Sequence, residues 1–131
     1  IMDRYYGPSN FFDYRGVRKF MADFRGVLPA YQRHFEAAAR RADLDWRLVA
    51  AVAYQESQWN PSAESPKGAF GIMMLTADTA ELMQLADRGN AVDNIHAGTK
   101  YLWRMRNRIA RVAPGVPEPD RTWMALAAYN M

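Results

Sequence analysis

The sequence contains no cysteine and only two histidines among its 131 residues. Without cysteine the chain cannot form a disulfide framework or use thiolate chemistry. His34 and His96 lie far apart and lack neighbouring ligands at a suitable spacing, so a zinc site is not expected. No glycine-rich phosphate loop is present either. We therefore expect neither a metal nor a cofactor.

Long apolar runs and a strong charge of one sign are also missing. No apolar run approaches the length of a membrane-spanning helix. The 17 basic and 14 acidic residues give a net charge of +3, without the clustered basic residues of a nucleic-acid-binding protein. The length fits one domain with a substantial core. The composition thus predicts a single globular domain with no nucleic-acid partner.

A helical pattern runs through most of the chain. It starts at Val17, is interrupted over residues 26–29, and resumes where Pro29 can open a helix in its first turn. No segment alternates for long enough to form a strand, so we predict an all-α fold with about six helices. Typical N-capping residues precede the later helices: Asp45 for residues 46–59, Thr76 for 77–86, Asp93 or Asn94 for the long helix that follows, and Asp120 for the last.

The two ends of the chain differ from this pattern. Residues 3–16 are aromatic and punctuated by glycine, proline and asparagine, which favours an irregular arm that packs on another segment. The chain begins Ile1-Met2-Asp3 with no signal-peptide pattern, and it ends inside a helical pattern without a C-cap. We therefore expect a fragment of a longer protein.

Glu56 stands where a helix is predicted to end and a loop to begin. It continues the apolar stripe of Val49 and Val52, so its carboxyl group is expected to face the core. Burial disfavours the charged form of a carboxylate and raises its pKa, which suits a general acid. The alternative is a glutamate that reaches solvent or bonds loop amides. The following loop, residues 60–71, contains Gly68 and Gly71, which permit close approach of a ligand or of another segment.

Three motifs carry a resemblance to a known family. They are Glu56-Ser57 followed by "WNPSAESPKGAFGIM", then "NIHAGTKYL" at residues 94–102, and "ALAAYN" at 125–130. Their order and sequence resemble the lytic transglycosylases, relatives of goose-type lysozyme. The resemblance implies a lysozyme-like all-α domain with a substrate groove. It also implies cleavage of peptidoglycan between N-acetylmuramic acid and N-acetylglucosamine, with formation of a 1,6-anhydro product.

The resemblance also implies roles for single residues. Glu56 corresponds to the catalytic acid and base, Ser65 to a substrate-contacting serine, and Tyr129 to a tyrosine that hydrogen-bonds the catalytic glutamate. Ser65 is otherwise a turn-forming residue before proline, and Tyr129 a core aromatic. Tyr101 lies in the second motif and is expected to line the groove. Met73 and Met74 could form an apolar floor for a sugar or belong to the core. Asn130 could face the cleft or merely end the fragment.

The number of acids supports this chemistry independently. Ordinary glycosidases use two carboxylates at a fixed separation. Apart from Glu56, the only acid within the three motifs is Glu64, in the loop. A single-acid site fits substrate assistance, in which groups of the sugar replace the missing nucleophile.

The resemblance further implies a division of the chain and a location. Residues 1–28 would be an arm from a preceding solute-binding-like regulatory domain, and residues 29–131 a catalytic domain truncated at its C-terminus. The protein would work in the periplasm of a Gram-negative bacterium, associated with the outer membrane. Three alternatives remain open: a hydrolytic goose-type lysozyme, a peptidoglycan-binding module that does not cut, and a helical interaction domain.

Overall fold

The structure is a computed structural model that describes residues 14–129. Over this range the chain is helical, with isolated β-bridges but no strand, so the predicted all-α class is confirmed. The elements are α2 (Tyr14–Gly26), the 3₁₀ turn η2 (Leu28–Ala30), α3 (Gln32–Ala42), α4 (Trp46–Ser57), α5 (Ala77–Leu82), α6 (Ala91–Val112) and α7 (Asp120–Tyr129).

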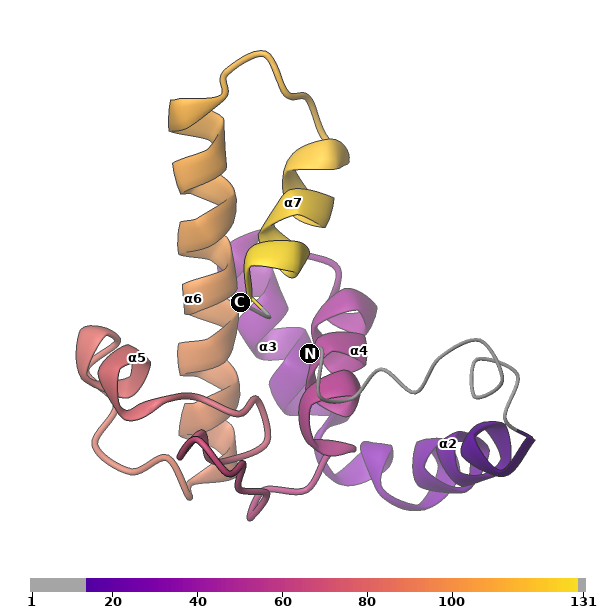
Figure 1. Ribbon diagram of the computed structural model, residues 1–131. Helices are drawn as coiled ribbons and strands as arrows, with labels where there is room; N and C mark the ends of the chain where they lie inside the picture. Colours follow the sequence, from indigo (N-terminus) through magenta and orange to yellow (C-terminus); the bar gives the residue numbers. More distant parts are fainter. Residues whose placement is uncertain (1–13, 130–131) are drawn as a thin grey trace.

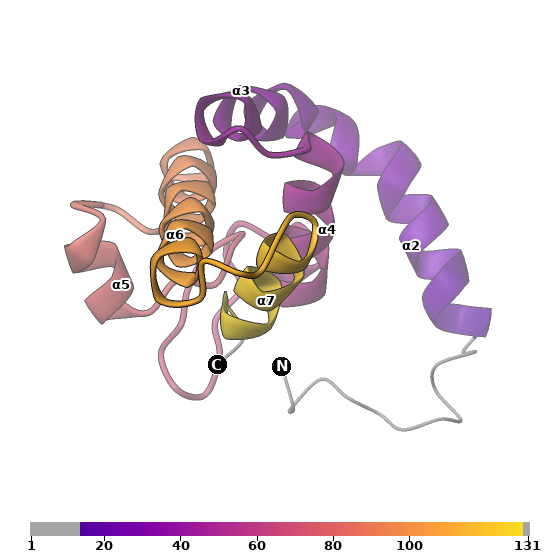
Figure 2. The same cartoon turned by 90° about the horizontal axis from the view of Figure 1, so that it is seen from above.

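The helices pack around α4 and α6. Helix α3 contacts both α4 and α6, and α7 lies along α6. In both views the C-terminal end of α7 lies between α6 and α4 (Figures 1 and 2). Fully buried side chains from three helices and one loop fill the centre: Phe35 of α3, Val49 of α4, Ile95 and Leu102 of α6, and Ile72 and Met73 of the loop between α4 and α5.

Two of the predicted N-caps are confirmed. The Asp45 carboxylate accepts from Arg47 N at 2.9 Å, and the Thr76 hydroxyl accepts from Thr79 N at 3.1 Å. Each satisfies a backbone N–H group that has no partner within its helix. Helix α5 ends at Leu82, four residues before the predicted end at residue 86.

The other two predicted caps are wrong. The cap of α6 is Asn90, whose side chain accepts from Asp93 N at 3.0 Å, so Asp93 lies in the first turn. Asn94 is buried one residue further on and bonds another segment. Helix α7 begins at Asp120 itself rather than after it. In both places several capping residues stand close together, and only the geometry of the turn selects one.

Helix α2 begins earlier than its pattern predicted and belongs to the packed domain. It starts at Tyr14, so residues 14–16 of the expected irregular arm are helical, and residues 3–13 lie outside the described range. The Phe20 ring lies 5.0 Å from that of Tyr54 and 6.0 Å from that of Trp59. The Tyr54 hydroxyl donates to the Asp23 carboxylate at 2.9 Å. This helix is therefore anchored to α4.

The anchor of α2 predicts a pH dependence of stability. Hydrogen bonds from Lys19 and from Tyr54 lower the pKa of Asp23, and desolvation opposes them. A lowered folded-state pKa stabilises the fold above the unfolded pKa of about 4, and the gain is lost as pH falls through the folded pKa. We expect Asp23→Asn to be less stable than the parent protein at pH 7 and to converge with it in acid. Urea unfolding across pH measures this, with Glu64→Gln as an exposed control; a difference independent of pH would contradict it.

The close contact between the loop and α6 depends on the absence of a side chain at Gly98. A Cβ built on Gly98 would lie 2.6 Å from Met73 Sδ and 2.9 Å from Met73 Cβ. Because Met73 is fully buried, it has no room to move away. Gly98 therefore sets how closely the loop approaches α6.

Gly98→Ala should consequently destabilise the protein. Overpacking of this kind costs about 1–3 kcal/mol, more than alanine gains in helix propensity. Gly115→Ala is the control, because a Cβ there meets no atom within 4 Å. Thermal unfolding of both variants checks the difference, and equal melting temperatures would refute this account of the packing.

Candidate active site

Helix α4 ends two residues earlier than predicted, and this places Glu56 beside the loop. Gln58 and Trp59 both adopt left-handed backbone conformations, with φ of 54° and 60°. The chain therefore reverses after Ser57, and the Trp59 indole donates to Ala50 O at 2.8 Å. Because the turn buries a whole indole, Trp59 packs against its own helix instead of extending it. Glu56 thus stands in the last turn of α4.

The Glu56 side chain is partly buried, on the stripe that continues from the buried residues Val49 and Val52. The predicted direction of its helix face is therefore correct. The next residue, Ser57, ties this end of the helix to the loop. Its hydroxyl oxygen lies 2.6 Å from Ile72 O and 3.1 Å from Ala53 O. The sequence interpretation gave Ser57 no role, although it stands beside the glutamate in the first motif.

Ser65 builds a turn in the loop. Its backbone N–H donates to Ala69 O at 2.9 Å, and its hydroxyl accepts from Ala69 N at 3.0 Å. Gly68 N donates back to Ser65 O at 3.0 Å, and Gly68 takes a φ of 88°. The turn-forming interpretation of Ser65 thus describes its observed contacts. Glu64, next to it, is exposed.

Asn94 clamps the loop to the start of α6. Its side-chain oxygen accepts from Met73 N at 2.9 Å, and its amide nitrogen donates to Phe70 O at 3.2 Å and to Arg88 O at 2.9 Å. The Arg88 guanidinium adds bonds to the carbonyl oxygens of Gly68 and Leu75. In the sequence, Asn94 is a possible cap and the first residue of the second motif, and neither position predicts this clamp. A polar residue directly before the apolar positions of the second motif was the available signal.

Tyr129 brings α7 to the same point of the loop. Its hydroxyl donates to Met73 O at 2.9 Å, and its ring lies 5.8 Å from that of Tyr101 on α6. Burial raises the pKa of Tyr129 well above its usual value, and the charge of Glu56 and the nearby Tyr101 raise it further. Glu56, Tyr101 and Tyr129 are therefore brought together from α4, α6 and α7.

The expected hydrogen bond from Tyr129 to Glu56 stays a prediction, and the structure gives the Tyr129 hydroxyl another partner. The hydroxyl proton goes to a main-chain carbonyl that Asn94 holds in place from the other side of the same residue. Tyr129 lies within electrostatic range of the Glu56 carboxylate. The alternative of a core aromatic agrees with the packing of the ring against the buried core, and the hydroxyl has a polar partner as well.

Met73 and Met74 differ in how deeply they are buried. The Met73 side chain is fully buried against Gly98 and Thr99, so it belongs to the core and cannot form a floor for a sugar. Met74 is only partly buried and takes a left-handed conformation with a φ of 52°, so it remains available to the groove. Asn130 lies outside the described residues.

Residues 14–129 show neither a metal-binding cluster nor a membrane-spanning helix. This part of the chain holds no group of three or more histidine, aspartate or glutamate side chains arranged to bind a metal ion. None of the helices described has both the length and the apolar character needed to span a bilayer.

The three motifs therefore converge at Met73, next to Glu56, and comparison with known proteins agrees with this arrangement. Residues 33–131 match the family described as the Transglycosylase SLT domain. The chain belongs to this family. The match confirms the resemblance found in the motifs, and with it the lysozyme-like fold.

Individual relatives are similar over the whole chain. It is 44% identical over 130 residues to membrane-bound lytic murein transglycosylase F of Saccharophagus degradans, covering 99% of this chain and 25% of that protein. The protein of the same name from Alcanivorax borkumensis is 47% identical over 131 residues, covering all of this chain and 27% of the relative. That of Actinobacillus pleuropneumoniae serotype 3 is 45% identical, with 26% of the relative covered. The chain spans about a quarter of the length of the curated relatives it matches.

The Tyr129 contact predicts a loss of stability on removing one oxygen atom. Tyr129→Phe leaves Met73 O without its donor, which should cost about 1–3 kcal/mol because the group lies in the interior. Tyr101→Phe keeps the ring pair and should change stability by less than about 0.5 kcal/mol. Denaturant unfolding distinguishes the two. A Tyr129→Phe variant of unchanged stability with a shifted pH–rate profile would instead favour a direct bond to Glu56.

Proposed function

We propose that this chain is the catalytic domain of a lytic transglycosylase that cleaves the β-1,4 bond between N-acetylmuramic acid and N-acetylglucosamine in peptidoglycan. The observation that carries the proposal is the convergence of Glu56, Tyr101 and Tyr129 around the backbone of Met73. Membership of the Transglycosylase SLT domain family supports it, as do relatives named lytic murein transglycosylase.

Glu56 acts first as an acid in this proposal. Its protonated carboxyl group gives a proton to the glycosidic oxygen, and the bond from that oxygen to C1 of the muramyl residue breaks. The 2-acetamido group of the same sugar stabilises the electron-poor C1, which makes a carboxylate nucleophile unnecessary. Glu64, the other acid of the first motif, is exposed on the loop, which agrees with a site that uses one carboxylate.

Glu56 acts next as a base. Its carboxylate takes the proton of the muramyl C6 hydroxyl while that oxygen bonds to C1, which closes the 1,6-anhydro ring. The carboxyl group is then protonated again, and no water enters the product. Neutral Tyr129 suits this cycle, because its raised pKa keeps a second negative charge away from the carboxylate.

The surrounding residues position the site. Ser57, Asn94 and Tyr129 fix the loop carbonyls and amides at the end of α4. Ser65 orders the loop turn, and its correspondence to the substrate-contacting serine of the family motif makes it a substrate contact in the proposal. Met74, Tyr101 and Asn130 are assigned to the groove on the same basis.

The proposal extends to the longer protein. The relatives are about four times as long as this chain and are named membrane-bound. We place the chain in the cell envelope, with periplasmic action at the outer membrane of a Gram-negative bacterium. Residues 1–28 would lead from a solute-binding-like regulatory domain into the catalytic domain of residues 29–131, and α2 would be the packed part of that connection.

Glu56→Gln should abolish cleavage while the fold is kept. An amide cannot donate and regain the proton, and loss of general acid–base catalysis costs roughly 10²- to 10⁴-fold in rate. Purified sacculi are incubated with each protein, and the released muropeptides are weighed by mass spectrometry. Glu64→Gln is the matched control and should keep its activity.

The same measurement separates the alternative functions. Anhydro-muropeptides are lighter by one water than the products of a hydrolytic lysozyme, so the product mass identifies the reaction. Binding to sacculi without any released product would favour a non-cleaving module. Comparable turnover by Glu56→Gln and the parent protein would exclude Glu56 as the catalyst.

A further inference from the structure

A pocket lies between α3 and α6, away from the residues that surround Glu56. Its volume is about 310 Å³, at the lower end for small-molecule sites. Two sides contribute to it, the C-terminal half of α3 and the middle of α6. The lining residues are Ala38, Arg41, Ala42, His96, Lys100 and Trp103.

The pocket uses a different face of α6 from the candidate active site. His96, Lys100 and Trp103 are spaced four and three residues apart, so they form one stripe along the helix. Tyr101 points elsewhere, to the ring of Tyr129. Figure 2 shows α3 and α7 on different sides of α6. A ligand in this pocket would therefore not compete with a glycan at Glu56.

The charged side chains that line the pocket, Arg41 and Lys100, are both cationic. Neither Arg41 nor Lys100 forms a salt bridge with any residue in the range 14–129. Burial lowers the pKa of His96, and the positive charges of Arg41 and His34 lower it further, while Asp93 opposes them. A group that carries negative charge would relieve this repulsion.

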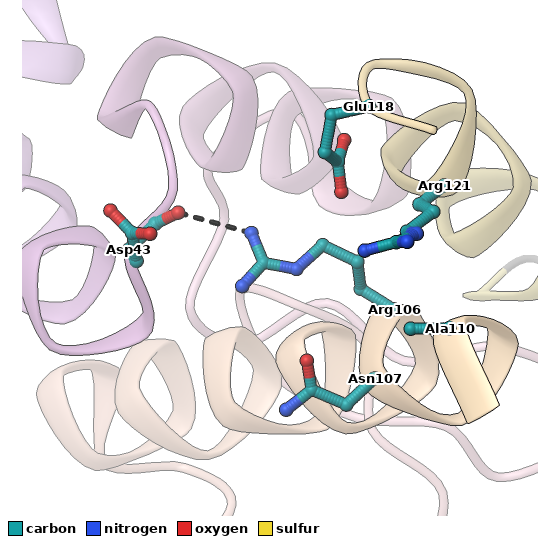
Figure 3. Close-up of a pocket in the computed structure, with 6 residues that line it drawn as sticks. All are labelled: Asp43, Arg106, Asn107, Ala110, Glu118 and Arg121. Atoms are coloured by element: carbon teal, nitrogen blue, oxygen red, sulfur yellow. Dashed lines mark hydrogen bonds between the residues drawn. The ribbon is translucent and has the colours of Figure 1, made fainter. Parts of the chain in front are cut away.

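In a second pocket, at the other end of α7 from Tyr129, the arginine side chains have hydrogen-bond partners (Figure 3). There the Arg106 guanidinium donates to the carbonyl oxygens of Asp43 and Ala42, which end α3. Arg121 donates to Val116 O, and the side chains of Asp43 and Glu118 also line the cavity. Its arginines serve the fold, whereas Arg41 and Lys100 have no such partners among the described residues.

The pocket between α3 and α6 also has an apolar surface. Ala38 and Ala42 are buried, and Trp103 keeps 37% of its surface exposed. An indole face beside two cations suits a ligand with a short aliphatic part and a carboxylate. We propose that this pocket binds a carboxylate-bearing residue of a peptidoglycan stem peptide.

The choice of ligand rests on the proposed function. A murein strand that reaches Glu56 carries stem peptides, whose residues combine carboxylates with short aliphatic chains. A half-open pocket of this size takes one such residue, whereas adsorption to a membrane surface needs no cavity. Binding here would hold a strand by its peptide while the glycan occupies the other side of α6. The pocket would thus favour strands that still carry their stems.

The test is binding of a soluble murein tetrapeptide to the intact protein, measured by calorimetry. Arg41→Ala/Lys100→Ala should weaken binding by roughly tenfold or more, since it removes two charge-assisted contacts. Arg40→Ala/Arg104→Ala is the matched control, because it removes one exposed cation from each of the same two helices outside the pocket. It should change the affinity by less than about twofold. The tetrapeptide with its carboxylates converted to amides should bind as weakly as the pocket variant does.

A second measurement needs no variant that could fail to fold. The pKa of the His96 imidazole, followed by NMR in the parent protein, should rise when the tetrapeptide binds, because the ligand offsets the charges of Arg41, His34 and Lys100. Inorganic phosphate and phosphatidylglycerol vesicles are tested in the same way. A response to either of these and none to the tetrapeptide would overturn the proposal. Equal losses in the pocket and control variants would overturn it as well.

Cleavage of sacculi is assayed in parallel, so that the two proposals can fail separately. Tetrapeptide binding without cleavage contradicts the lytic activity and leaves the pocket as a stem-peptide site. Cleavage without tetrapeptide binding contradicts the stem-peptide site and leaves the lytic activity supported. If both hold, the pocket variant should cleave strands with stems less well, while its rate on glycan stripped of peptide should be unchanged.

Discussion

The architecture of the site depends on how Met73 is held. Its backbone N–H is fixed by Asn94 and its carbonyl oxygen by Tyr129, while its side chain fills the space left by Gly98. Asn94 and Gly98 belong to the second motif, Tyr129 to the third, and Met73 to the first. The three stretches that mark the family are therefore the three parts of one contact. Main-chain groups inside a protein must be paired, so each of these partners is costly to remove.

This contact explains why the glutamate can sit at a helix end. A carboxylate beside a mobile loop would be poorly positioned, and catalysis requires placement to within a fraction of an ångström. Here the loop is bonded to α4 by Ser57 and to α6 by Asn94. The reversal at Gln58 and Trp59 ends the helix after Ser57, so Glu56 stands in its last turn. Hydrogen-bonded neighbours thus compensate for the irregular backbone around Glu56.

Helix α6 serves two purposes with different faces. One face carries Tyr101 to the ring of Tyr129, and another contributes His96, Lys100 and Trp103 to the pocket against α3. Because a helix displays its residues all around its axis, neighbouring positions in the sequence take on unrelated tasks. A glycan site and a peptide site on one helix would recognise both chemical components of the same polymer.

The local features of the protein can be predicted from its residues alone. Helix periodicity gave the all-α class, Asp45 and Thr76 were recognisable caps, and the stripe from Val49 predicted the direction of Glu56. These features depend on residues within one or two turns, where spacing alone decides which groups can meet. The motifs indicated the family in a different way, because three of them occur in the same order as in that family.

The partners of the polar side chains depend on the packing of the whole domain. Tyr129 bonds a carbonyl 56 positions away, and Asn94 bonds an amide 21 positions away rather than capping its helix. Met73 went to the core and Met74 did not, although they are adjacent and chemically identical. A side chain that can donate or accept has many possible partners of similar strength, and the sequence cannot rank them. Packing ranks them, because it fixes which distant backbone group is buried within reach and would otherwise stay unpaired.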